Sequence, residues 1–166
     1  RQMCIRDRDG GAGDDTLTGY YRGNNTLKGG AGNDTLKLSA ISSSSSRHSN
    51  VFEGGAGDDT IIGGYGSDTY VFNAGDGKDI ICDYSGNDKL EFGEGIGQSN
   101  LTFARRGGDI VITLVDADGM ATGDEVTLKD AFNSSGYRIE TLMFADGTNL
   151  SGADAFSATL TVEGSD

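Results

Sequence analysis

The chain has 166 residues, of which 28 are glycine, none is proline and 35% are hydrophobic, and its formal net charge at pH 7 is −13. Abundant glycine without proline excludes a collagen helix, and so acidic a surface is unfavourable for nucleic acid or anionic membranes and attracts cations. No apolar run is long enough to span a bilayer, and two cysteines, Cys4 and Cys82, predict neither a disulfide framework nor a zinc site.

A nonapeptide repeat dominates the first half of the chain, after residues 1–8, which do not fit it and are interpreted as a non-native leader. Near-perfect copies occupy residues 10–18, 29–37, 54–62 and 63–71, and weaker copies occupy 19–28, 45–53, 74–82 and 83–91. The eighth position is apolar in every copy: Leu17, Leu27, Leu36, Phe52, Ile61, Tyr70, Ile81 and Leu90. The sixth is always Asp or Asn: Asp15, Asn25, Asp34, Asn50, Asp59, Asp68, Asp79 and Asp88. So regular a pattern argues against a disordered glycine-rich linker.

The repeat predicts a six-residue turn followed by a short strand whose middle side chain points inward. If two repeats complete one coil, the sixth-position carboxylates of successive coils lie about 5 Å apart, near the spacing of neighbouring strands. Their repulsion is about 3 kcal/mol per pair at an effective dielectric of about 20. A hard divalent cation between the turns converts this repulsion into ligation, and carboxylate and carbonyl oxygens are the ligands that calcium prefers.

The copies GGAGDDTLT, GGAGNDTLK, GGAGDDTII and GGYGSDTYV resemble the GGxGxDxUx repeats of the RTX family, the haemolysin-type calcium-binding repeats. The resemblance covers residues 9–91, with a serine-rich insert at about 38–49. It implies an all-β fold, a right-handed parallel β-roll that binds several Ca²⁺ ions, at least three, between stacked turns. In this family one turn supplies carbonyls from positions two and four and its sixth-position Asp. The turn stacked on it supplies carbonyls from positions one and three and its own Asp.

Carried onto this chain, the resemblance implies three metal sites, whose paired aspartates are 19 or 20 residues apart, so that bulges must absorb the excess over two nonapeptides. The first site pairs Gly55, Gly57 and Asp59 with Ala74, Asp76 and Asp79; the second pairs Gly64, Gly66 and Asp68 with Asp83, Ser85 and Asp88; the third pairs Gly11, Gly13 and Asp15 with Gly29, Ala31 and Asp34.

The repeat period ends near residue 91, and short strands are predicted at 101–103, 109–115, 126–128 and 139–144. The stretches AGDGKDIICDYSGNDKLEFGEGI, LTFARRGGDIVITL and IETLMFADGT resemble the domain that often adjoins RTX repeats. We therefore expect a small β capping module over 92–152 that shields the last coil. Residues 153–166 are expected to be a linker and the start of a further repeat, because Glu163 to Asp166 match its positions three to six.

Other motifs favour simpler interpretations. Residues 114–125 match part of an EF-hand loop, but Leu114 stands at the first ligand position and strands flank the loop, so a β-turn is the better interpretation. The glycines at 93–97 lack a lysine and adjoin two glutamates, which is unsuitable for phosphate. His48 lies in the serine-rich insert, where nothing would hold a catalytic triad.

The predicted function is calcium binding by a module of a larger secreted bacterial protein, located outside the cell or on its surface, which folds on Ca²⁺ after export. RTX relatives use type I secretion machinery, so this is an expected partner of the parent protein. The module is predicted not to be an enzyme. The alternative is a polysaccharide-binding or targeting module of a secreted lyase, epimerase or adhesin, with an extracellular glycan as partner; a hydrolase is a third, weakly supported hypothesis.

Overall fold

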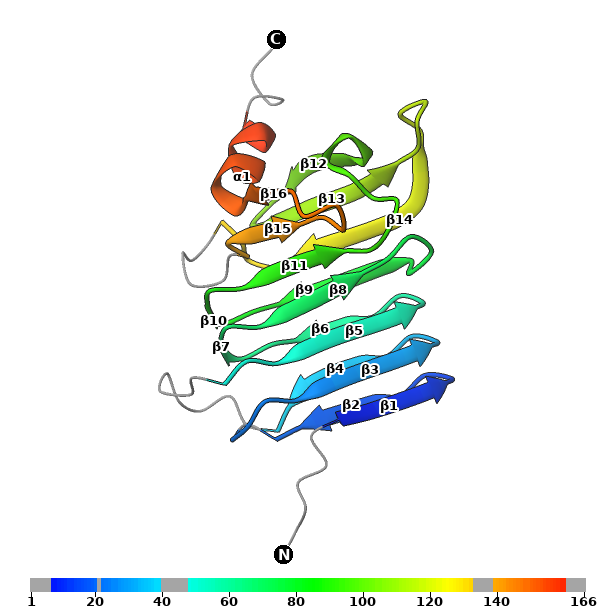
Figure 1. The fold of residues 1–166 in the computed structure, drawn as a ribbon, viewed down its shortest axis with the longest axis vertical. Helices are drawn as coiled ribbons and strands as arrows, with labels where there is room; N and C mark the ends of the chain where they lie inside the picture. Colours follow the sequence, from blue (N-terminus) through cyan, green and yellow to red (C-terminus); the bar gives the residue numbers. More distant parts are fainter. Residues whose placement is uncertain (1–6, 21, 40–47, 133–138, 161–166) are drawn as a thin grey trace, which may run out of the picture.

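The computed structural model describes residues 7–20, 22–39, 48–132 and 139–160, and they form two seven-stranded sheets (Figure 1). The first sheet contains, in spatial order, β1 (Asp7–Ala12), β3 (Thr26–Ala31), β5 (Val51–Ala56), β8 (Thr69–Phe72), β11 (Lys89–Phe92), β15 (Thr141–Met143) and β16 (Asn149–Ser151). The second contains β12 (Leu101–Arg106), β13 (Asp109–Val115), β14 (Ala121–Leu128), β9 (Lys78–Cys82), β6 (Thr60–Ile62), β4 (Thr35–Leu38) and β2 (Thr16–Gly19). Two short strands, β7 (Tyr65–Gly66) and β10 (Ser85–Gly86), pair beside them.

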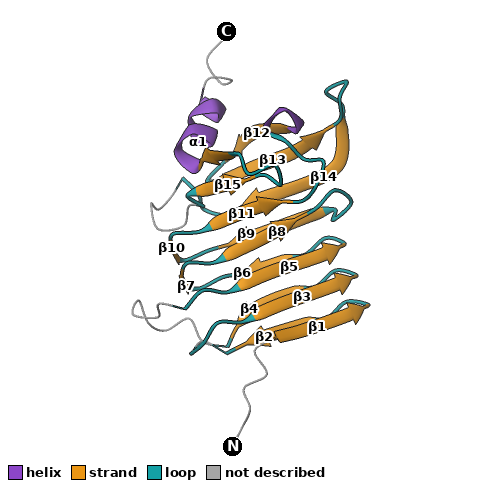
Figure 2. Cartoon of the chain, viewed as in Figure 1, coloured by secondary structure: helices purple, strands orange, loops and turns teal. Residues whose placement is uncertain are grey.

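The repeats form a parallel β-roll, as predicted, in which the chain alternates between the two sheets and two nonapeptides make one coil. Thr16 is paired with Thr35, and Thr60 is paired with Ile80, in parallel ladders. The stacked strands are seen edge to edge in Figure 2. The all-β fold predicted from the repeats is therefore confirmed.

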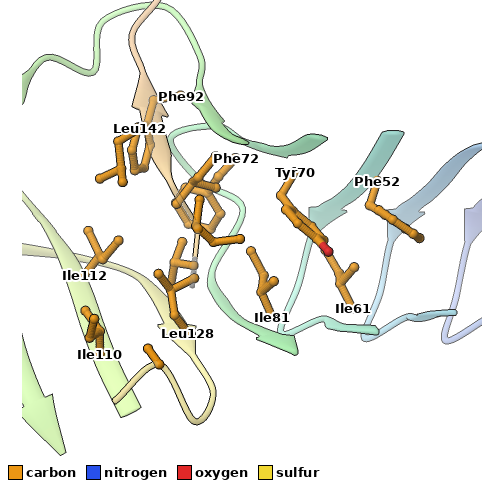
Figure 3. Packing of buried hydrophobic residues seen from close by; sticks show 14 of the residues in the cluster. Phe52, Ile61, Tyr70, Phe72, Ile81, Phe92, Ile110, Ile112, Leu128 and Leu142 are labelled. Atoms are coloured by element: carbon orange, nitrogen blue, oxygen red, sulfur yellow. The ribbon is translucent and has the colours of Figure 1, made fainter. Parts of the chain in front are cut away.

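The core lies between the two sheets and is built from the eighth positions of the repeats. All eight predicted inward side chains are buried: Leu17, Leu27, Leu36, Phe52, Ile61, Tyr70, Ile81 and Leu90. The rings of Phe52 and Tyr70 stack with their centroids 5.4 Å apart, and Figure 3 shows both beside Ile61 and Ile81. A side-chain period that matches the coil thus places the eighth-position residue of each repeat in the interior. Strands β4, β8 and β11 each bury a second apolar side chain, namely Leu38, Phe72 and Phe92.

The second half of the chain continues the roll, because its strands extend both sheets. Strand β14 is parallel to β9, and β15 is parallel to β11, with Leu142 paired to Leu90. Antiparallel strands β12, β13 and β16 then finish the sheets. Figure 3 shows Ile110, Ile112 and Leu128 packing next to the repeat core, so one hydrophobic core serves both halves.

The structure differs from the sequence analysis at three segments. Asp7 and Arg8, expected to belong to a leader, lie in β1 and are paired with Thr26 and Leu27. Leu38 closes β4, so the insert begins later than expected, and much of it (40–47) lies outside the described residues. Residues 153–160 of the expected linker lie in helix α1 (Gly152–Leu160), whose first turn is capped by the Ser151 hydroxyl, which accepts the Asp154 N–H. Residues 161–166, the expected further repeat, are outside the described residues.

Two loops agree with the simpler interpretations. The EF-hand-like segment is a hairpin turn between β13 and β14, in which Asp116 accepts the N–H groups of Asp118 and Met120. The glycine-rich segment after β11 leads into a short 3₁₀ helix, Gln98–Asn100. In the part of the chain that the structure describes, no helix has both the length and the apolar character needed to cross a membrane.

Candidate metal centre

One edge of the roll carries a column of four stacked sixth-position aspartates, which we call the first column: Asp15, Asp34, Asp59 and Asp79. In each step the backbone N–H of one Asp donates to Oδ1 of the Asp in the next coil. The N–O distances are 2.7 Å from Asp15 to Asp34, 2.7 Å from Asp34 to Asp59 and 3.0 Å from Asp59 to Asp79. Two of the three predicted pairs are thus brought together. The Asp34–Asp59 step was missed, because the serine-rich insert separates these residues by 25 positions.

The second carboxylate oxygen, Oδ2, of the first-column aspartates indicates that a cation binds along this column. Oδ2 of Asp15, Asp34 and Asp59 is buried and has no hydrogen-bond partner among the described residues. Leaving a buried ionised oxygen unsatisfied is strongly unfavourable. Burial accordingly raises the pKa of Asp59 to about 6 and that of Asp79 to about 8. A bound Ca²⁺ would supply the missing positive charge, so the residues present fit the ion.

The turns that carry these aspartates expose backbone carbonyls to one another. Gly55 and Gly57 have φ angles of 97° and 148°, a region that glycine enters freely. A Cβ at either residue would lie 2.0 Å from the carbonyl oxygen of Gly30 or Gly32 in the coil below. The repeat therefore needs glycine at positions two and four for close approach between coils. The third-position carbonyls, including that of Asp76, accept the fourth-position N–H groups of the coil below, as in Gly57 to Asp76 at 2.8 Å.

The opposite edge begins as a column of amides rather than carboxylates. The Asn25 side-chain amide donates to Oδ1 of Asn50 at 2.8 Å, and the Asn50 amide donates to Oδ1 of Asp68 at 2.8 Å. Each amide serves as both donor and acceptor, so this ladder is neutral and satisfied without an ion. The repeat pattern places Asp and Asn at the same sixth position, whereas the stacked coils give the two residue types different roles.

The same edge, which we call the second column, ends in a cluster of three buried carboxylates: Asp68, Asp83 and Asp88. The Asp68 N–H donates to Asp88 Oδ1 at 2.7 Å, so the remaining predicted pair of aspartates is also stacked. Burial and mutual repulsion raise the pKa values of Asp83 and Asp88. The Tyr70 hydroxyl donates to Asp83, whose side chain points into the cluster, whereas the family resemblance implies only a backbone-carbonyl ligand from this residue.

Two further acidic residues close the columns and were not among the predicted site residues. Asp124 accepts the N–H groups of Gly75 and Gly77 at 3.0 and 3.2 Å, and Glu140 accepts the Asp88 N–H at 2.7 Å. Both come from the second half of the chain, where no repeat marks them. The backbone of three further predicted residues, Gly64, Gly66 and Ser85, lies in the stacked turns of the second column, where Gly66 pairs with Gly86. In the first column, the Gly13 N–H donates to the Ala31 carbonyl at 2.7 Å.

Comparisons with known proteins agree with this geometry. The model of the RTX calcium-binding nonapeptide repeat matches residues 9–36, 46–78 and 71–98, and that of the haemolysin-type calcium binding protein related domain matches residues 109–154. No curated protein matches the chain significantly. Among solved structures, the extracellular lipase LipA from Serratia marcescens is similar, with a TM-score of 0.50 and 28% identity. The match covers 73% of this chain and 18% of the lipase chain, so the chain spans less than a fifth of the lipase. The chain belongs to the family of RTX calcium-binding nonapeptide repeats, here joined to a haemolysin-type calcium binding protein related domain.

Proposed function

We propose that this roll holds four calcium ions between stacked turns, three along the first column and one in the second. The first-column sites lie between Asp15 and Asp34, between Asp34 and Asp59, and between Asp59 and Asp79. The observation that carries the proposal is the row of buried, unpartnered Oδ2 atoms on Asp15, Asp34 and Asp59. The turn carbonyls assigned from the sequence would complete an oxygen shell of the kind that calcium takes.

Calcium binding is proposed to drive folding of the roll. A chain with a formal net charge of −13 gains little by stacking its aspartates in buried columns unless a cation neutralises them. The free energy of binding then becomes free energy of folding, because the stacked turns exist only in the folded chain. Magnesium is a poor substitute, since it demands tight octahedral geometry and keeps its waters.

The parent protein is proposed to be secreted, and this module to be a non-catalytic part of it. The similar lipase is extracellular, and type I secretion would export the chain before it folds. Extracellular calcium modules bind with dissociation constants of about 10⁻⁴–10⁻³ M, which keeps them empty inside a cell and filled outside. A glycan-binding role finds less support: among the described residues, Tyr20 is the one aromatic side chain that the structure leaves largely exposed.

Counting bound calcium tests this proposal. Calcium-free protein is titrated by isothermal calorimetry, and the total is checked by metal analysis after equilibrium dialysis. The expected result is four ions per chain at saturation, with heat signals that accompany a gain of β-structure. Protein that binds no calcium at millimolar concentration would contradict the proposal.

A further inference from the structure

The carboxylate cluster of the second column differs in composition from every step of the first column. Carboxylate oxygens of Asp68, Asp83 and Asp88 lie within 4.8 Å of one another, and these residues are 0%, 2% and 0% exposed. Asp83 occupies the first position of its nonapeptide, where the four near-perfect copies have glycine. A third carboxylate is therefore added to a pair of stacked turns that elsewhere contributes two.

Two oxygens of this cluster lack a hydrogen-bond donor among the described residues while the three carboxyl groups are ionised. Asp83 Oδ1 and Asp88 Oδ2 are buried and accept no hydrogen bond from the described residues. The other oxygens are occupied: Asp68 accepts from Asn50 and from the Gly64 N–H, and Asp88 Oδ1 accepts the Asp68 N–H. Because a buried, unpartnered carboxylate oxygen is strongly unfavourable, the pair points to a bound cation.

Tyr70 fixes the orientation of the added carboxylate. Its ring occupies the inward column, stacked on Phe52, and its hydroxyl donates to Asp83 Oδ2. The leucine, isoleucine and phenylalanine at this position of the other copies have no donor. A Cβ at Gly63 would lie 2.6 Å from Asp83 Oδ2, so glycine there leaves room for the carboxylate. With Oδ2 held by the hydroxyl, Oδ1 remains available to an ion.

We propose that Asp68, Asp83 and Asp88 form a three-carboxylate cation site, in which the Asp83 side chain is a ligand and Tyr70 is a positioning residue. This rests on the calcium-binding function proposed above and makes one of its sites chemically distinct. Three negative charges bind Ca²⁺ more tightly than two. They also favour trivalent lanthanides, whose charge they balance.

The test titrates calcium into the calcium-free chain of 166 residues in the presence of a chromophoric chelator. Wild-type protein should bind one ion more tightly than the rest. Asp83→Asn should weaken that ion at least about tenfold, the loss seen even for groups that only support a metal ligand. Tyr70→Phe keeps the ring and should weaken the same ion while the others bind as before, which a general loss of stability would not produce. Asp116→Asn removes a charge from a surface turn and should behave as wild type.

The outcomes separate this site from the wider proposal. An Asp83→Asn titration that matches Asp116→Asn, with calcium still bound, would overturn the three-carboxylate site alone. No calcium bound by any variant would overturn the calcium function and this site with it. Lanthanum displacement on wild-type protein decides the question if the variants do not fold. One calcium displaced at lower lanthanum concentration than the rest supports the site, and uniform displacement of all ions overturns it.

Discussion

Asp59→Asn removes a carboxylate that lies between two coils and therefore serves two of the proposed calcium sites. Asp34 donates its backbone N–H to Asp59 Oδ1, and Asp59 donates its own to Asp79 Oδ1. The roll already accepts asparagine at the sixth position, where the Asn50 amide donates to Asp68. We therefore expect a variant that folds in calcium but has lost two ions.

The expected loss in the free energy of unfolding follows from the two calcium ions that the variant no longer binds. At a calcium concentration one hundred times the dissociation constant, each ion stabilises the folded chain by about 2.7 kcal/mol. Asp59→Asn should therefore lower the free energy of unfolding by about 5 kcal/mol, a large part of the 5–15 kcal/mol typical of a domain. Asp79→Asn, at the end of the column, should lose one ion and about half as much. The assay is urea unfolding followed by circular dichroism at fixed calcium, with bound calcium counted in parallel.

Asp58→Asn is the matched control, because Asp58 is the exposed neighbour and, among the described residues, its carboxylate accepts only the Lys78 N–H in the next coil. It removes the same charge and should retain every ion. The reasoning would be refuted if Asp59→Asn and Asp58→Asn bound equal numbers of ions. Equal losses from Asp59→Asn and Asp79→Asn would instead refute the shared position of Asp59.

Three further perturbations have defined outcomes. Ile61→Ala opens a cavity in the buried column and should lower the free energy of unfolding in urea by about 2–5 kcal/mol. Ile80→Ala, at a residue that is 41% exposed, should change it by no more than about 0.5 kcal/mol. Equal losses from the two variants would show that the inward face of the strands is assigned wrongly. Burial raises the pKa of Asp79 from 3.8 to about 8, so its contribution to the stability of the calcium-free fold is fully present below 3.8 and is lost as the pH rises from there through about 8. The circular dichroism of calcium-free protein should therefore show more β-structure at acidic pH, and an unchanged signal would count against buried carboxylates as the obstacle to folding. Gly54→Ala places a methyl carbon 2.2 Å from Asp59 Oδ2. Calorimetry of this variant should therefore find the same calcium ions missing as in Asp59→Asn. Binding of all the ions found in wild-type protein would contradict the assigned position of that oxygen.

The sequence predicts the features that the nonapeptide period controls. Leu36 and Ile61 are buried because every eighth position faces inward, and Asp59 stacks on Asp79 because two repeats close one coil. Both follow from a local pattern that recurs along the chain. The step from Asp34 to Asp59 could not be predicted, because residues inserted between the repeats hide how many coils separate them.

Other features depend on contacts that no local pattern encodes. The second half of the chain contains recognisable strands, but nothing in their sequence shows that β14 joins β9 in a parallel ladder. The inward orientation of Asp83 depends on the Tyr70 hydroxyl, which belongs to the coil below. Likewise the amide ladder of Asn25 and Asn50 becomes visible only when these residues are stacked.

Calcium dependence of the β-roll is the central claim, and circular dichroism during a calcium titration tests it most directly. Calcium-free protein in a chelator at neutral pH should show little β-structure, and added calcium should produce a cooperative gain that magnesium at the same concentration does not reproduce. Identical spectra in chelator and in saturating calcium would contradict the claim.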